Sequence, residues 1–438
     1  MKDELLKRIA SSEAVVGVIG LGYVGLPLLL EFAGKGLAVL GLDTDEKKVE
    51  ELTAGRSYIR HIAAEAIRTS FAGNGRAAAT TDFSRIAECD AVLICVPTPL
   101  TPNREPDLSY VIATAETIAP FLRPGQLVVL ESTTYPGTTE EVLTPVLEAK
   151  SGLKAGPDFF VAYSPEREDP NNDEYSTATI PKVVGGIDEA SLAVAEALYG
   201  RVVAKTVPVA NCGTAEATKL MENIFRSVNI ALVNELKVIF EAMGIDVWEV
   251  IRAASTKPFG YMPFYPGPGL GGHCIPIDPF YLTWKARECG ISTRFIELAG
   301  EINVAMPDYV INRAMLALND RGKALRGTRV LLVGLAYKKN VDDDRESPTY
   351  ALWKRLLEHG ATVSYHDPCC PVVRPSRDHS DLAGTTSVTL EEITAEAFDL
   401  AIISTAHDEV DHDELAARLP LVVDTRGVCR PAANVIGA

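Results

Sequence analysis

The chain has 438 residues, a length for which two or three domains are expected because one hydrophobic core rarely serves more than about 300 residues. Its composition, 47% hydrophobic and 23% charged, is typical of a globular protein, and no apolar run is long enough to span a membrane. The formal net charge of −17 argues against nucleic acid as a partner, because binding a phosphate backbone needs clustered Lys and Arg.

Residues 1–208 alternate short apolar runs with amphipathic stretches. Strands are predicted at residues 15–19, 38–43, 91–96, 127–131, 159–163, 182–185 and 202–206. Helices are predicted at residues 24–34, 45–54, 110–121 and 189–198. Strands that alternate with helices predict a parallel, doubly wound sheet, so this part is expected to form a Rossmann domain.

Residues 209–324 change to an all-helical pattern. A long helix is predicted over residues 214–243, with Thr214 as its cap and Gly244 as its stop, and a second helix over residues 246–255. Further helical patterns begin at residue 280. We therefore expect a central helical domain.

The segment of residues 256–279 interrupts the helical pattern. Gly or Pro occupies 11 of its 24 positions, far above the average of roughly one in eight, as in a disordered linker. It also carries Phe259, Tyr261, Met262, Phe264 and Tyr265, and linkers rarely hold so much apolar surface. The composition therefore favours an ordered, functional loop.

Residues 325–438 return to alternating elements. Strands are predicted at residues 329–333, 362–365, 400–404 and 421–424, with a helix at residues 349–359. The expected fold class is thus α/β, with two Rossmann-like parallel-sheet domains joined by a central all-helical domain.

Gly20, Gly22 and Gly25 form a GxGxxG motif that follows the first predicted strand and opens a helix. Such glycines allow a tight turn and let a pyrophosphate approach the helix N-terminus. Asp43 ends the second strand, where a carboxylate accepts from the ribose hydroxyls and repels a 2′-phosphate, and no Arg follows it. The motif predicts NAD, rather than NADP, as the cofactor.

Cys274 lies in the sequence GGHCIPID. A single cysteine is more often a packed hydrophobe than a nucleophile, but two preceding glycines allow the backbone to approach a ligand closely. Beside a nicotinamide, a thiolate adds to an aldehyde to give a thiohemiacetal, which a second oxidation converts to a thioester.

Three further residues are candidates beside Cys274. Lys219 and Asn223, four residues apart on the long predicted helix, share one helix face, which is also compatible with a solvated surface. Asp278 follows Cys274 by four residues, either as a site residue or as the cap of the next helix.

Polar residues follow several strands of both sheets, at the edge where ligands bind in open α/β folds. Candidates at these strand ends are Thr133, Glu166, Arg167, Lys338 and Arg345. A zinc site from His366, Asp367, Cys369 and Cys370 is not expected, because ligands so close in sequence do not close a tetrahedron. The eight cysteines include no CxxC pair, and residues 1–20 do not resemble a signal peptide, so a reducing cytoplasm is expected.

Six motifs in order resemble the UDP-glucose/GDP-mannose dehydrogenase family over essentially the whole chain. They are GLGYVGLP at 20–27, STTYPGTT at 132–139, SPERxDP at 164–170, EATKLMENIFRSVNIALVNEL at 216–236, GGHCIPIDP at 271–279 and GLAYKKNVDDDRESP at 334–348. The resemblance implies an NAD-binding domain (residues 1–208), a central helical domain for dimerisation and the catalytic loop (residues 209–324), and a UDP-sugar-binding domain (residues 325–438).

The resemblance also implies roles for single residues. It makes Cys274 the nucleophile, Lys219, Asn223 and Asp278 the acid–base and oxyanion groups, and Glu166 the carboxylate of the hydrolytic half, with Thr133 beside them. The expected cofactor site comprises Gly20, Gly22, Tyr23, Val24, Gly25, Asp43, Lys48, Thr98, Thr133 and Arg345. The expected substrate site comprises Arg167, Lys219, Asn223, Phe264, Tyr265, Gly271, His273 and Lys338. Val341, where the family usually has Thr, and His273, where UDP-glucose members usually have an aromatic residue, depart from the pattern.

The implied reaction is the NAD-dependent, four-electron oxidation of the C6 hydroxyl of a UDP-sugar, through a Cys274 thioester that water hydrolyses to the uronate. The SPERxDP motif and His273 favour UDP-N-acetylglucosamine, with UDP-N-acetylmannosamine, UDP-glucose and GDP-mannose as alternatives. Family members dimerise through the long central helix, which predicts a homodimer.

Two more distant functions are compatible with parts of the sequence. A two-electron β-hydroxyacid dehydrogenase has a similar layout, but Cys274 and residues 325–438 argue against it. A non-catalytic NAD-binding regulator would not need the set of Cys274, Lys219, Asn223 and Asp278.

Overall fold

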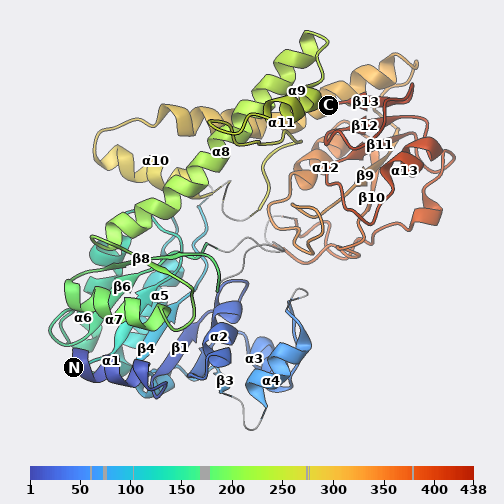
Figure 1. The fold of residues 1–438 in the computed structure, drawn as a ribbon. Coiled ribbons are helices and arrows are strands. Elements are labelled where there is room, and N and C mark those ends of the chain that lie inside the picture. Colours follow the sequence, from blue (N-terminus) through green and yellow to red (C-terminus); the bar gives the residue numbers. More distant parts are fainter. Residues whose placement is uncertain are drawn as a thin grey trace. The chain divides into compact units, whose positions relative to one another are not determined.

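The computed structural model describes residues 1–59, 62–72, 76–101, 103–167, 178–272, 275, 277–376 and 379–438. Its elements run from an N-terminal sheet through two long helices to a second sheet (Figure 1). The chain divides into two compact units, Met1–Glu222 with Phe280–Ile291 and Asn223–Pro279 with Ser292–Ala438. None of the helices within the described ranges has the length and apolar character needed to cross a membrane.

The first unit is built on an eight-stranded sheet of order β3-β2-β1-β4-β5-β6-β7-β8. The strands are β1 (Val15–Ile19), β2 (Ala38–Leu42), β3 (Ala77–Thr80), β4 (Ala91–Ile94), β5 (Leu127–Leu130), β6 (Phe160–Tyr163), β7 (Lys182–Gly186) and β8 (Thr206–Val209). Neighbouring strands are parallel except β6 and β7, which are antiparallel. The α/β fold is confirmed, and this one pair departs from the expected parallel sheet.

Helices cover both faces of this sheet. They are α1 (Lys2–Ala10), α2 (Gly25–Gly34), α3 (Glu46–Thr53), α4 (Ala64–Phe71), α5 (Ser109–Ile118), α6 (Thr144–Ser151) and α7 (Glu189–Tyr199), with short turns η1 (Phe83–Glu88), η2 (Ala119–Phe121) and η3 (Thr139–Leu143). In β4, Leu93 joins the buried cluster that contains Leu26 of α2, whereas Ile94 joins the cluster that contains Val111 of α5. This alternation is what a strand buried on both faces requires.

Two strand predictions in this unit are corrected. The strand predicted at residues 202–206 is wrong, because Val202 and Val203 pack into the core in the turn after α7 and the strand is Thr206–Val209. The strand β3 was not predicted, because its sequence AAAT lacks the β-branched run and aromatic residues typical of strands.

The helix α8 (Cys212–Ala242) is continuous over 31 residues, and the boundary between the two units falls within it. It begins at Cys212 rather than at Thr214, and Asn211 Oδ1 accepts from the Thr214 backbone N–H at 2.8 Å. The predicted cap Thr214 is therefore wrong, since Asn211 fills that role. After the helix, Gly244 has a φ of +71°, which favours glycine there.

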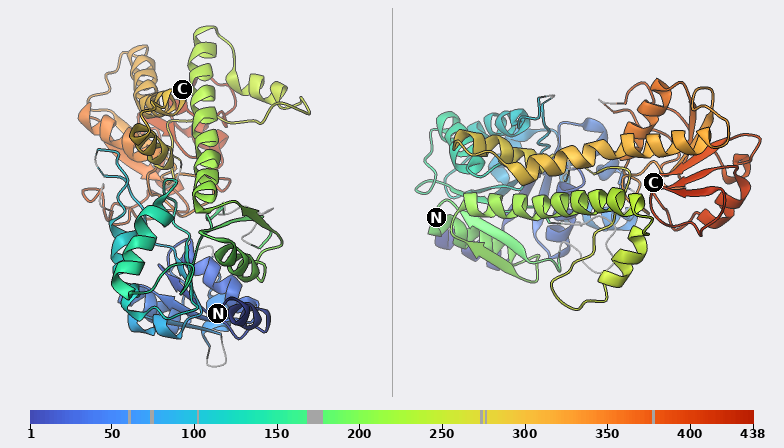
Figure 2. Two further views of the ribbon diagram at one scale, coloured as in Figure 1. Left: turned by 90° about the vertical axis from the view of Figure 1, so that its left-hand side faces the viewer. Right: turned by 90° about the horizontal axis from the view of Figure 1, so that it is seen from above.

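The second unit holds the rest of α8, further helices and a five-stranded parallel sheet of order β10-β9-β11-β12-β13. Its strands are β9 (Arg329–Val333), β10 (Thr362–His366), β11 (Leu400–Ile403), β12 (Val422–Asp424) and β13 (Val435–Gly437). Its helices are α9 (Val247–Ala254), the start of α10 (Asp278–Glu288), α11 (Arg294–Asn319), α12 (Pro348–Glu358), η4 (Leu390–Glu392) and α13 (His412–Arg418). In this unit α8 and α11 lie side by side (Figure 2), and Asn234 Nδ2 donates to Asn303 Oδ1 at 2.9 Å.

The loop before α10 is packed at its glycine-rich end. Pro266, Gly267 and Pro268 are buried, and the Gly267 N–H donates to Asn234 Oδ1 at 3.0 Å. The large side chains that suggested an ordered loop are mostly exposed on the single chain, for example Phe259 at 73% and Met262 at 63%. The burial in this segment is therefore concentrated at residues 266–268 rather than at those side chains.

Candidate active site

The loop between β1 and α2 has the geometry of a dinucleotide cradle. Gly20 has a φ of +89°, and a Cβ there would lie 2.6 Å from the Cys95 carbonyl oxygen. A Cβ at Gly25 would lie 2.0 Å from the Gly20 carbonyl oxygen, so the fold itself excludes side chains at both positions. At Gly22 nothing lies within 4 Å of that point, which leaves open space at the N-terminus of α2. The cradle therefore fits a pyrophosphate of NAD.

Asp43 is held at the carboxyl end of β2 by three donors. Its carboxylate accepts from the backbone N–H groups of Leu21 at 2.8 Å and Asp45 at 3.0 Å, and from Lys48 Nζ at 3.0 Å. The bond to Leu21 ties the carboxylate to the glycine loop. The structure thus brings three of the expected cofactor residues, Gly20, Asp43 and Lys48, to one edge of the sheet.

The ends of β4 and β5 are joined by side chains. Thr98 Oγ1 donates to the Thr133 carbonyl oxygen at 2.8 Å, and Ser132 Oγ donates to the Val96 carbonyl oxygen at 2.7 Å. Tyr281 of α10 is fully buried and donates its hydroxyl to the Thr98 carbonyl oxygen. Sequence reasoning missed Tyr281, because no motif marks a tyrosine whose hydroxyl binds a backbone carbonyl far away in the sequence.

Lys219 and Glu166 lie together in the first unit. Lys219 is 4% exposed, donates from Nζ to the Glu166 carbonyl oxygen, and lies 3.7 Å from Glu166 Oε2. The arrangement sets a buried ammonium beside a partly exposed carboxylate at the carboxyl end of β6.

The guanidinium of Arg167, the next residue, makes three hydrogen bonds. Its Nε and Nη2 donate to Glu222 at 3.3 and 2.6 Å, and its Nη1 donates to the Pro181 carbonyl oxygen at 2.5 Å. A guanidinium has five N–H groups, and the bonds to the described part of the chain use three of them, which leaves two for other acceptors.

A cavity opens at this edge of the first sheet. Its lining includes Val24 at the start of α2, Glu166 and Arg167 after β6, and Glu131 and Lys182 deeper in the sheet. Glu131 and Lys182 form a buried ion pair, with Nζ 2.7 Å from Oε2. Lys182 was not among the expected site residues.

Asn223 and Asp278 meet in the second unit. Asn223 Nδ2 donates to Asp278 Oδ2, and both residues are buried, at 0% and 3% exposed. Arg226 Nη2 donates to the other side of the amide, at Asn223 Oδ1. Asp278 is the first residue of α10. Two of the predicted catalytic side chains are thus direct partners.

The glycines before the predicted nucleophile pack closely within the second unit. A Cβ on Gly271 would lie 2.9 Å from Tyr337 Cβ and 2.8 Å from Pro348 Cδ, and one on Gly272, whose φ is +90°, would lie 3.1 Å from the Tyr337 ring. In the structure these glycines make room for Tyr337, and the expectation that they also let the backbone approach a ligand stays a prediction. The predicted residues His273 and Cys274 lie outside the described residues.

Four further predicted substrate and cofactor residues lie in the second unit. Phe264 packs edge-on against Phe225 of α8 at 5.7 Å between ring centroids, and Tyr265 stacks on Trp248 of α9 at 6.3 Å. Lys338 is half-buried in the loop after β9, and Arg345 forms a two-pronged pair with Asp343 at 2.9 and 2.6 Å.

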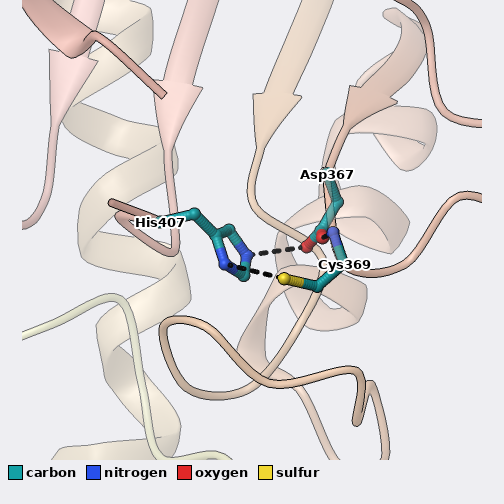
Figure 3. Close-up of side chains that lie close together, drawn as sticks. All are labelled: Asp367, Cys369 and His407. Carbon is teal, nitrogen blue, oxygen red and sulfur yellow. Dashed lines mark hydrogen bonds and ion pairs between the residues drawn. The ribbon is translucent and has the colours of Figure 1, made fainter. Parts of the chain in front are cut away.

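His407, rather than His366 or Cys370, joins Asp367 and Cys369 in a buried cluster (Figure 3). His407 Nε2 lies 3.0 Å from Asp367 Oδ2, while its Nδ1 lies 3.6 Å from Cys369 Sγ and accepts from the Asn340 backbone N–H at 3.0 Å.

Backbone N–H groups also donate to the carboxylate of Asp367. Asp367 also accepts from the backbone N–H groups of Leu335, Ala336, Cys369 and Cys370 at 2.6 to 2.8 Å. Burial raises the pKa of Asp367, but the bonds from His407 and the backbone outweigh it and hold that pKa below its ordinary value. A carboxylate that already serves five donors is better suited to fastening the loops after β9, β10 and β11 than to binding a metal ion.

Comparison with known proteins agrees with this geometry. The profiles of the UDP-glucose/GDP-mannose dehydrogenase family match residues 14–203 (NAD binding domain), 213–305 (central domain) and 331–431 (UDP binding domain). A UDP-N-acetyl-D-glucosamine 6-dehydrogenase of Pseudomonas aeruginosa is 37% identical over 399 residues, which cover 90% of each chain. A UDP-N-acetyl-D-mannosamine dehydrogenase of Methanococcus maripaludis is 34% identical over 94% of this chain and 92% of that one. The solved UDP-D-ManNAc dehydrogenase of Pyrococcus horikoshii superposes with a TM-score of 0.86 at 32% identity, over 97% of this chain and 98% of that one.

The dinucleotide cradle and the relatives define an NAD-dependent oxidoreductase. The chain belongs to the UDP-glucose/GDP-mannose dehydrogenase family, and it is an NAD-dependent UDP-sugar 6-dehydrogenase. The predicted family, cofactor and enzyme class are confirmed, and the two-electron and non-catalytic alternatives are set aside.

Proposed function

We propose that the substrate is UDP-N-acetylglucosamine. The observation that carries the proposal is the cavity lined by Glu166 and Arg167, where two N–H groups of the guanidinium remain after its bonds to Glu222 and Pro181. A 2-acetamido carbonyl is a suitable acceptor for such a donor. Relatives named for UDP-N-acetyl-D-glucosamine and for UDP-N-acetyl-D-mannosamine both match the chain, so the epimer is the second candidate.

For catalysis, we propose that Cys274 holds the sugar covalently as a thiohemiacetal and then as a thioester. Asp278 and Lys219 handle the proton of the C6 hydroxyl, Lys219 and Asn223 stabilise the oxyanions, and Glu166 activates the water that hydrolyses the thioester. NAD, held at Gly22 and Asp43, supplies the hydride acceptor of each oxidation.

The other cysteines support this choice of nucleophile. Burial raises the pKa of the thiols of Cys89, Cys95, Cys212, Cys370 and Cys429, which lowers the share of reactive thiolate at each. All seven described cysteines are free thiols, which is in keeping with a reducing cytoplasm.

The remaining contact proposals divide between the two ligands. Lys338 binds the UDP phosphates, and His273, Gly271, Phe264 and Tyr265 border the sugar. Thr98, Thr133, Tyr23, Val24, Lys48 and Arg345 contact the cofactor.

We further propose the three-domain division at residues 208 and 324 and a homodimer through α8. One family profile falls within each proposed domain. Apolar side chains of α8 remain exposed on the single chain, among them Leu232 at 49% and Ile239 at 46%, which supports a helix face covered by a second copy.

Initial rates with UDP-N-acetylglucosamine, UDP-N-acetylmannosamine and UDP-glucose test the substrate. The expected kcat/KM is highest for UDP-N-acetylglucosamine and lower for UDP-glucose by about 10-fold or more, because a partly buried donor that loses its amide acceptor costs about 1–3 kcal/mol. Arg167→Lys should narrow that gap, while Arg201→Lys, at a residue in the turn after α7 that donates to Ser12 Oγ, should leave it unchanged. Equal or faster turnover of UDP-glucose by the wild type would reject the hexosamine proposal.

A further inference from the structure

The antiparallel strand β7 brings Lys182 to the functional edge of the first sheet. In the pairing of β6 with β7, Tyr163 lies opposite Gly185 and Ala162 opposite Gly186. Continuing that register past the carboxyl end of β6 sets Lys182, the first residue of β7, opposite Glu166. In an all-parallel sheet the first residue of a strand would lie at the other edge.

Lys182 ties three chain segments together at this edge. Its Nζ donates to Glu131 Oε2 at 2.7 Å and to the Pro165 carbonyl oxygen at 3.1 Å. Tyr199 donates its hydroxyl to the other oxygen of Glu131, and its ring centroid lies 4.9 Å from Lys182 Nζ. Lys182 and Glu131 are 7% and 1% exposed.

Stability alone does not explain the buried ion pair of Lys182 and Glu131. The cost of removing two charges from water roughly cancels their attraction, so a buried ion pair adds little to stability compared with apolar side chains of the same size. The hydrogen bonds of the pair do restrict geometry, because Lys182 and Tyr199 donate to the two oxygens of Glu131 and Lys182 also donates to the Pro165 carbonyl. Pro165 immediately precedes Glu166, so this geometry reaches the predicted hydrolytic carboxylate.

We propose that Lys182 is a positioning residue for Glu166. By donating to both the Glu131 carboxylate and the Pro165 carbonyl, it fixes the backbone just before Glu166 and so orients the Glu166 side chain. This inference rests on the proposed role of Glu166 in hydrolysis. In that step water attacks the thioester carbon, Glu166 takes the proton that the water loses, and the carbon–sulfur bond breaks with its electron pair on the sulfur of Cys274. No electrons pass to or from NAD, since both oxidations are complete by then.

Rapid-mixing measurements of NADH separate this step from the earlier ones. Two NADH form before hydrolysis, so a defect confined to hydrolysis gives a burst of two NADH per active site and then a slow steady rate. Lys182→Met should show that burst, with the steady rate reduced about 10-fold or more and the KM for NAD within about 2-fold of wild type. Lys182→Arg, which keeps a donor for Pro165, should restore most of the steady rate.

A neutral double variant separates positioning from folding. Lys182→Met leaves Glu131 buried without its cation, whereas Glu131→Gln with Lys182→Met removes both charges and should restore the unfolding midpoint while keeping the burst. Lys154→Met, at an exposed lysine paired with Glu148 in the same unit, is the matched control and should behave as wild type. Recovery of the wild-type steady rate in the double variant would overturn the positioning role.

The reference variant Glu166→Gln distinguishes the two possible failures. If Glu166→Gln shows no burst and a normal steady rate, the proposed function of Glu166 is wrong, and the inference is wrong with it. If Glu166→Gln shows the burst and Lys182→Met does not, only the inference about Lys182 is wrong.

Discussion

At the scale of single residues, the cofactor end of the site depends on one carboxylate. Asp43 is 7% exposed and already serves two backbone N–H groups and Lys48. While Asp43 is present, the positive charge of Lys48 is balanced by the Asp43 carboxylate, so Lys48 is poorly placed to bind a 2′-phosphate. The preference for NAD follows from this pair rather than from the absence of an arginine alone.

Replacing Asp43 should weaken that preference. Asp43→Ala removes the repulsion between the Asp43 carboxylate and a 2′-phosphate, and it leaves the charge of Lys48 unpaired by Asp43 beside the adenosine ribose. The kcat/KM for NADP should therefore rise relative to that for NAD by about 10-fold or more. In the double variant with Lys48→Ala the gain should shrink, because no cation remains for the phosphate. Steady-state kinetics with both cofactors decide it, and an unchanged NAD/NADP ratio in Asp43→Ala would contradict the account.

Residues within motifs were easier to predict than their partners. The glycine loop and Asp43 could be predicted because the cradle is local in sequence. Lys182 could not, since its place opposite Glu166 depends on the direction of β7, which short apolar runs do not reveal. Gly271 and Gly272 were expected to allow close approach to a ligand, whereas the close neighbour that the structure gives them, Tyr337, belongs to the later motif at residues 334–348 and could not be predicted.

At the scale of elements, hydrophobic periodicity gave most strands to within a residue or two. The errors lie where a different contact decides the end of an element, as with Asn211 at the start of α8 and the core packing of Val202 before β8. The short strand β13 and the helix α13 were not predicted at all, because each is too brief for a clear period.

The helix α8 carries a buried lysine that should cost stability. Lys237 is 4% exposed, and its Nζ has no hydrogen-bond acceptor among the residues that the structure describes. Burial lowers the pKa of Lys237 to about 8, with Arg426 and Arg313 acting in the same direction and Glu241 and Asp424 opposing them. In the unfolded chain Lys237 keeps its proton up to about pH 10.5. The charged lysine therefore destabilises the folded state below pH 8, and the free energy of unfolding rises between pH 8 and 10.5.

Lys237→Met should remove that penalty. The free energy of unfolding at pH 7 should rise by about 2–3 kcal/mol, and the gain over wild type should fade as the pH approaches 10. Urea denaturation at fixed protein concentration measures it, with the exposed Lys150→Met in α6 as a control that should show no such pH dependence. A gain that is absent at pH 7, or the same at pH 7 and 10, would show that Lys237 is not a buried charge.

At the scale of the whole molecule, the order of the domains was predictable and the details of the sheets were not. Alternating elements at both ends and an all-helical middle indicated two α/β parts around a helical one. The strand order and the antiparallel pair depend on long-range pairing, which periodicity does not report. The matches to three family profiles in the same order agree with that layout.

The central claim, a four-electron oxidation through Cys274, is tested most directly by stoichiometry. Wild-type protein with NAD and UDP-N-acetylglucosamine should yield two NADH and one uronate per sugar consumed. Cys274→Ala should lose this turnover by a factor of about 10³ or more, as expected when a nucleophile is removed, while Cys289→Ala, at an exposed thiol, should keep it. One NADH per sugar in the wild type, or near-normal turnover by Cys274→Ala, would contradict the account.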